Sequence, residues 1–151
     1  MIDYIDSRYI ENSIEEEIKR ADHLIYVSLK YTRTCDVIKN VIHRLSNVFD
    51  FGIIEILEKE KKKNKIKSIP GSPLARVSLL EKLLKGKVKK YIALYMMLRK
   101  IERSEFIRRD EYRKNVALLV KDASIVVDMA RLKELFEKTK EFVKFVREFE
   151  V

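Results

Sequence analysis

Two apolar stripes of helical period, joined by a short polar turn, constrain this 151-residue chain more than any other feature. Within 13–31 the apolar residues recur in steps of three and four, and a second, wider stripe follows over 37–58. Between them stands Tyr31-Thr32-Arg33-Thr34, whose threonines are poor helix-interior residues and good caps. We therefore predict two antiparallel helices within 13–58, the first capped by Ser13, with one long kinked helix as the alternative.

Two further helices are expected in the middle of the chain. Ser72-Pro73 is a cap followed by a proline at the first helical position, and Gly86 is the natural C-terminal stop of that helix. A fourth helix is predicted from Val88 to about Glu102. Its apolar residues, with Met96 and Met97 interpreted as core filler, leave little polar face, so it should be the most buried helix.

The two ends of the chain and residues 116–128 give weaker signals. Residues 1–12 suit a short helix or an arm packed on the bundle. Residues 116–128 hold two short apolar runs separated by turn-type residues, which predicts a small β-hairpin, with buried helix as the alternative. Asp128 would then cap a last amphipathic helix over 129–149. The predicted fold is mainly α: one domain, 1–151, built as an antiparallel helical bundle of about five helices.

Composition excludes several classes of protein. Charged residues make up 38% and apolar residues 46% of the chain, which is typical of a globular domain rather than a disordered one. The longest apolar run, 91–98, is far shorter than the ~20 residues of a membrane span, and the N-terminal segment is acidic. We therefore expect a cytoplasmic protein with no membrane partner. Few Gly and Pro and no Gln, alongside many Lys, Glu and Arg, indicate a thermophile.

No motif for catalysis, metal binding or cofactor binding is present. Three glycines cannot make a phosphate-binding loop, and the single Cys35 excludes an internal disulfide and a multi-cysteine zinc site. His23 and His43 would lie at the same height of the helical pair, but both fall off its apolar stripes. We interpret them as two unrelated surface histidines. No catalytic residue, metal ligand or cofactor is therefore predicted.

The positive charge is concentrated in the middle third of the chain. The net charge is +9, and residues 59–114 carry nineteen basic and six acidic side chains. A lysine-rich run at 59–67 is expected to be a solvated helix end. Lysines and arginines can neutralise phosphates, and interleaved aromatic rings (Tyr91, Tyr95, Phe106, Tyr112) can stack on unpaired bases. The candidate nucleic-acid-binding residues are Lys82, Lys85, Lys87, Lys89, Lys90, Arg99, Lys100, Arg103, Arg108, Arg109, Arg113 and Lys114.

One segment of this basic region, Arg-Asp-Glu-Tyr-Arg-Lys-Asn at 109–115, resembles the motif of HEPN domains. These helical domains occur in many defence and toxin–antitoxin systems, and active members cleave RNA with an Arg, a polar residue, a short spacer and a His. Arg109 and Asp110 match the opening, and Asn115 stands where the His would be. The resemblance implies a member that does not cleave RNA, because Asn cannot take up a proton near neutral pH as imidazole does.

Three functional hypotheses follow. The first is a non-enzymatic, HEPN-like protein that binds RNA or another polyanion through residues 82–114. The second is a structural or protein-interaction module, such as a homodimer, whose basic surface meets an acidic protein. The third, ranked below both, is a HEPN-type ribonuclease with a displaced active site.

Overall fold

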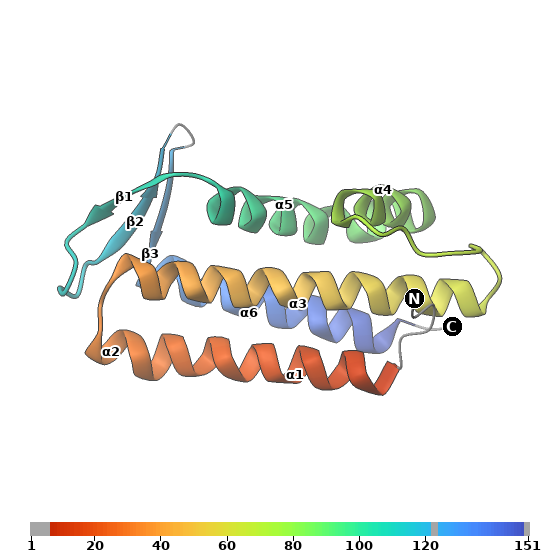
Figure 1. Ribbon diagram of the computed structural model, residues 1–151, viewed down its shortest axis with the longest axis horizontal. Coiled ribbons are helices and arrows are strands. Elements are labelled where there is room, and N and C mark those ends of the chain that lie inside the picture. The colour runs from red at the N-terminus through yellow and green to blue at the C-terminus, as the bar shows by residue number, and fades with distance from the viewer. Residues whose placement is uncertain (1–6, 122–123, 150–151) are drawn as a thin grey trace.

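The fold is known from a computed structural model, which describes residues 7–121 and 124–149 (Figure 1). A long central helix, α3 (Cys35–Lys62), has α1 (Ser7–His23) on one side and α4 (Pro73–Leu84) and α5 (Lys89–Arg103) on the other. The last helix, α6 (Met129–Glu148), packs against α3 and α1. A small three-stranded sheet closes the end of the bundle where α3 begins.

The predicted helical pair is confirmed as two helices rather than one kinked helix. The first continues past α1 through a π-helical segment, η1 (Leu24–Ser28), and a last turn, α2 (Leu29–Tyr31), before the chain leaves helical geometry. Thr34 caps α3 by accepting a 3.3 Å hydrogen bond from the Val37 amide. The expected cap at Ser13 is wrong. Within the described residues α1 already runs from Ser7, Ile10 adds to its buried stripe, and the Ser13 hydroxyl donates to the Tyr9 carbonyl inside the helix.

The predicted N-terminal helix or arm over 1–12 falls partly within α1, and its first six residues lie outside the described residues. The π-helical segment explains a feature of the sequence. Ala21, Ile25 and Leu29 are spaced by four and all buried, although two successive steps of four drift off one face of a regular α-helix. The wider turn of η1 keeps Leu29 in the core.

Helix α3 is the most buried helix, not α5 as predicted. It spans 28 residues, which is about 40 Å, and contacts α1, α4, α5 and α6. Helix α5 packs mainly on α3 and keeps an outer face, on which Met96 is 40% exposed. Counting apolar residues overestimated its burial, because burial depends on how many neighbours surround a helix as well as on its own side chains.

The start of α4 is confirmed and its end is not. The Ser72 hydroxyl accepts from the Ala75 amide, with Pro73 at the first helical position. The helix ends at Leu84, where Lys85 takes a positive φ of 50°, and a 3-10 turn, η2 (Lys85–Val88), leads directly into α5. Gly86, the predicted stop, has an ordinary φ.

The predicted hairpin at 116–128 is confirmed as the pair β2 (Ala117–Val120) and β3 (Ile125–Asp128). The sheet has a third strand, β1 (Phe106–Arg109), which the sequence did not predict; the strand order is β1-β2-β3, all antiparallel. A bundle of about five helices is therefore corrected to a helical body with a three-stranded sheet. As predicted, Asp128 caps α6 by accepting a 2.8 Å hydrogen bond from the Arg131 amide.

Among the residues that the structure describes, no helix is long and apolar enough to cross a membrane.

Candidate nucleic-acid interface

The basic residues of the middle third divide between the two ends of α3. At the end where α3 stops, the α4–α5 connection carries five exposed lysines, which we call the junction cluster: Lys82, Lys85, Lys87, Lys89 and Lys90. At the end where α3 starts lies the β1–β2 loop, with Arg109, Arg113 and Lys114. The length of α3 separates these two groups by about 40 Å, so they form two surfaces rather than one.

The remaining predicted residues lie between the two groups or are already engaged. Lys100 and Arg103 are exposed at the end of α5. Arg99 donates to the Tyr95 hydroxyl at 3.3 Å and lies over the Tyr95 ring. Arg108 points from β1 to two carboxylates and is described below.

The β1–β2 loop is fastened to the turn between α2 and α3. The Tyr112 amide donates to the Arg33 carbonyl at 2.6 Å, and the Glu111 carboxylate accepts from the Cys35 amide at 2.8 Å. These bonds join segments that lie more than 70 residues apart in the chain. Arg33, which the sequence prediction missed, is thereby brought to the loop. We call Arg33, Arg109, Arg113 and Lys114 the loop cluster.

Arg108 joins the two segments of this junction and is paired with two carboxylates. Its guanidinium donates to Asp36 at 2.9 Å and to Glu111 at 3.1 Å. The hydrogen bond from Arg108 holds the pKa of Asp36 below its ordinary value, and the two carboxylates raise the pKa of Arg108 above its own. Arg108 therefore positions the loop. In contrast, the four loop-cluster side chains have no carboxylate partner within 7–121 and 124–149.

The loop itself is held in a conformation that side chains disfavour. Asp110 and Tyr112 have positive φ values of 52° and 70°, each of which costs about 1–2 kcal/mol for a residue other than glycine. Internal hydrogen bonds hold this shape: Asn115 donates to the Asp110 carboxylate at 2.9 Å, and the Arg113 amide donates to the Asp110 carbonyl. Asp110 and Asn115, which stand at the polar position and the His position of the HEPN-like motif, therefore bond each other.

Most of the aromatic rings that the sequence interleaves with the basic residues belong to the core. Tyr95 is fully buried and donates to Asp50; burial, and then this hydrogen bond, raise the pKa of Tyr95 to about 12. Tyr91 packs on Phe142, and Phe106 is covered by Lys39 and Arg108. Tyr112 is the exception at 75% exposed, and the sequence missed a second exposed ring at this end, Tyr31, at 82%. A signal for Tyr31 existed, because it lies two residues past the buried stripe.

The junction cluster borders a cavity of about 800 Å³. Its apolar wall comes from α4 and α6, and its charged wall includes Lys85 and Lys87. Glu60, only 1% exposed, lies in the same wall with Lys63 Nζ at 3.4 Å and Lys65 Nζ at 3.9 Å, so these two lysines are partly neutralised. The cavity is lined by Glu60, Lys63, Lys65, Leu83, Leu84, Lys85, Gly86, Lys87, Phe145, Glu148 and Phe149.

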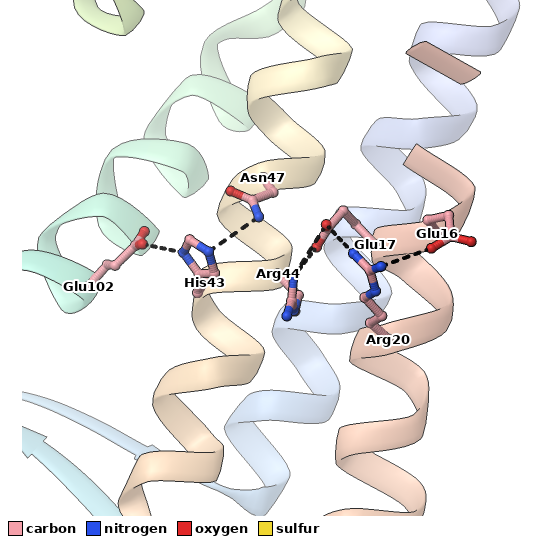
Figure 2. A network of polar contacts seen from close by, with 7 residues as sticks. All are labelled: Glu16, Glu17, Arg20, His43, Arg44, Asn47 and Glu102. Carbon is pink, nitrogen blue, oxygen red and sulfur yellow. Dashed lines mark hydrogen bonds and ion pairs between the residues drawn. The ribbon is translucent and has the colours of Figure 1, made fainter. Parts of the chain in front are cut away.

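The two histidines do not form a common site. Figure 2 shows His43 directed toward α5, where its Nδ1 atom lies 2.6 Å from a Glu102 carboxylate oxygen, while Asn47 approaches its other ring nitrogen at 3.4 Å. On the far side of α3, Arg44 and Arg20 share the buried Glu17. His23 lies on this second side, beside Arg44. The contact between His43 and Glu102 joins α3 to α5.

Across the described parts of the chain, no three histidine, cysteine or carboxylate residues lie close enough to hold a metal ion. The Cys35 thiol is buried and donates to the Ala117 carbonyl at 3.3 Å; burial raises its pKa, which disfavours the reactive thiolate. Comparisons of the chain with protein-family models, with curated proteins and with solved structures found no match. The proposals below therefore depend on the geometry of this chain.

Proposed function

We propose that this chain is a non-enzymatic, HEPN-like protein that binds RNA or another polyanion, and that the loop cluster makes the principal contact. The observation that carries the proposal is the docking of the β1–β2 loop on the α2–α3 turn. It gathers Arg33, Arg109, Arg113 and Lys114 without a described carboxylate partner, while nearby Arg108 is neutralised by two. Unpaired cations on a fixed backbone suit phosphate groups, because the loop loses little conformational entropy when a ligand binds.

Salt dependence measures how many phosphates the protein neutralises. For single-stranded nucleic acid, log K falls with log salt by about 0.7 per neutralised phosphate, so four contacts predict a slope of about −3. Filter binding of a single-stranded RNA between low and moderate salt gives this slope. Arg113→Glu with Lys114→Glu should weaken binding strongly and bring the slope to about −1.4, because two contacts are lost.

The matched control is Lys133→Glu with Lys144→Glu, which makes the same change of net charge on the exposed side of α6. This control should bind within about threefold of the original protein if local contacts rather than net charge dominate. A third variant, Lys85→Glu with Lys87→Glu, tests the junction cluster. Equal losses in the loop and α6 variants would refute a localised site, and a loss confined to the junction variant would move the site to the other end.

An interaction module remains the second candidate, favoured by one feature of the sheet. Ile107, Leu119 and Val126 are aligned across β1, β2 and β3 on the outer face, where Ile107 is 51% and Val126 41% exposed. Such a row suits a protein partner, including a second copy of this chain. Sedimentation analysis of the protein and of the Ile107→Lys variant tests the interaction module. If the protein is a dimer that Ile107→Lys dissociates, and if it does not bind RNA, the interaction module is favoured over the first proposal.

Ribonuclease activity ranks below both candidates. The amide of Asn115 is bonded to Asp110, and an amide does not take up a proton near neutral pH as a general base must. RNA cleavage that disappears in Asn115→Ala would revive this hypothesis.

A further inference from the structure

We infer that the loop cluster takes unpaired bases, which stack on Tyr31 and Tyr112, and that the ligand is consequently single-stranded. This inference rests on the proposed function. It goes further because it names the form of nucleic acid and assigns the recognition of bases to two tyrosines.

Both tyrosine rings are mostly exposed to solvent. Tyr31 and Tyr112 are 82% and 75% exposed, and no described ring contact covers either of them. Three other tyrosines already make packing contacts. Tyr95 is in the core, Tyr91 packs on Phe142, and Tyr26 packs on Phe136 with Lys133 over its ring. A large aromatic face left in water is unfavourable for the isolated protein, and two at one end suit a ligand that covers them.

The backbone places both rings away from the core. Tyr31 follows the buried Leu29 by two residues, which is a rotation of about 200° around the helix. Tyr112 has a φ of 70°, an unfavourable value for a residue with a large side chain. The hydrogen bonds from its amide to the Arg33 carbonyl and from the Cys35 amide to the Glu111 carboxylate hold it there. Tyr112 is therefore held in an unfavourable backbone conformation, and its ring has no ring–ring or cation–π contact within the described residues, as is common at binding sites.

Aromatic rings and cations alternate along both segments. Arg33 follows Tyr31 by one residue, and Arg113 and Lys114 follow Tyr112 directly. The hydrogen bond between Tyr112 and Arg33 makes the two short segments neighbours. A single strand presents the same alternation, with a flat base beside each phosphate. In a duplex the base faces are already stacked on one another. A duplex could therefore contact the cations of this surface but could not stack bases on the two tyrosine rings.

The experiment compares a fluorescein-labelled 10-nucleotide single strand of RNA with the duplex of the same length, by anisotropy at fixed salt. The single strand should bind at least about fivefold more tightly, because stacking contributes about 1 kcal/mol or more per base. Tyr31→Ala and Tyr112→Asn should each weaken single-strand binding by about fivefold or more and leave duplex binding unchanged. Tyr→Phe at either position should bind like the original protein.

Two choices of variant keep the result interpretable. Asn tolerates a positive φ better than other residues, so Tyr112→Asn removes the ring without adding strain to the loop. Tyr9→Ala is the matched control, since Tyr9 is 61% exposed on α1, near the opposite end of the molecule. Neither tyrosine variant removes a charge, so the salt slope should stay unchanged while affinity falls.

The outcomes separate this inference from the proposed function. If both tyrosine variants bind the single strand like the original protein while Arg113→Glu with Lys114→Glu loses it, the cationic site stands and base stacking is refuted. Equal affinity for single strand and duplex also refutes the inference. If neither oligonucleotide binds at low salt, the proposed function fails as well.

Discussion

The close approach of α3 and α6 at Gly52 predicts that a single added methyl group destabilises this fold. A Cβ atom at Gly52 would lie 2.9 Å from Phe142 Cζ, closer still to Phe142 Cε2, and 3.2 Å from Val146 Cγ2. The Phe142 ring has little room to move, because it is stacked against Phe49 at 4.3 Å between centroids and tilted against Tyr91 at 5.3 Å. Gly52→Ala must therefore displace a ring in the centre of the core.

The magnitude follows from two opposing effects. Alanine is favoured over glycine in a helix interior by about 1 kcal/mol, whereas overpacking a well-packed core costs about 1–3 kcal/mol. Because two of the three contacts are shorter than real Cβ atoms accept, the cost lies in the upper part of that range. We expect Gly52→Ala to lower the free energy of unfolding by about 1–2 kcal/mol, or the melting temperature by roughly 2–8 °C for a chain of this size.

Urea unfolding followed by far-ultraviolet circular dichroism measures this change. Gly86→Ala is the matched control, because a Cβ there meets nothing within 4 Å and its φ is ordinary. It should be neutral or slightly stabilising. The double variant Gly52→Ala, Phe142→Leu should lose less than the sum of its single changes, since the smaller side chain makes room. Gly52→Ala as stable as Gly86→Ala would refute the packing of α3 on α6 described here.

Three other predictions can be tested directly. Asp128→Ala removes the side-chain acceptor of the Arg131 amide and should cost about 1 kcal/mol of unfolding free energy in urea, whereas Asp128→Asn should retain most of it. Asp36 has a pKa below 3.8, so its bond with Arg108 contributes stability that is present above pH 3.8 and is lost as the pH falls through the folded-state pKa. Carboxyl NMR titration should show this low value, and Arg108→Gln should return it toward 3.8; no change would contradict the role given to Arg108. The composition predicts a thermophile protein, and a melting temperature within the mesophile range of about 45–65 °C would contradict it.

The helical part of the fold could be predicted because its signals are local. The caps at Thr34, Ser72 and Asp128 each need only a few neighbouring residues, and the apolar stripes of α3 and α6 follow the helical period. Strand β1 was missed because Arg108 and Arg109 make up half of it, so its strand character comes from pairing with β2 rather than from its own residues. Likewise, nothing local distinguishes Lys85 from Gly86 as the residue with a positive φ.

The candidate site was only partly predictable for a related reason. The sequence indicated the basic character of 108–114, including Arg109, Arg113 and Lys114. It could not show that the α2–α3 turn docks on this loop, because the hydrogen bonds that join them cross more than 70 residues. Nor could a count of charges show that Arg108 is neutralised by Asp36 and Glu111. Which cations are free is decided by tertiary contacts.

The π-helical segment gives the molecule room for one extra exposed residue without changing its core. A π turn accommodates one residue more than an α turn, and each residue advances an α-helix by about 100°. Deleting Val27, which is 42% exposed within that segment, would return the segment to an α turn and leave Ala21, Ile25 and Leu29 on the buried face. Homologous chains with and without this extra residue would then share one bundle and differ in how many side chains this turn presents to solvent.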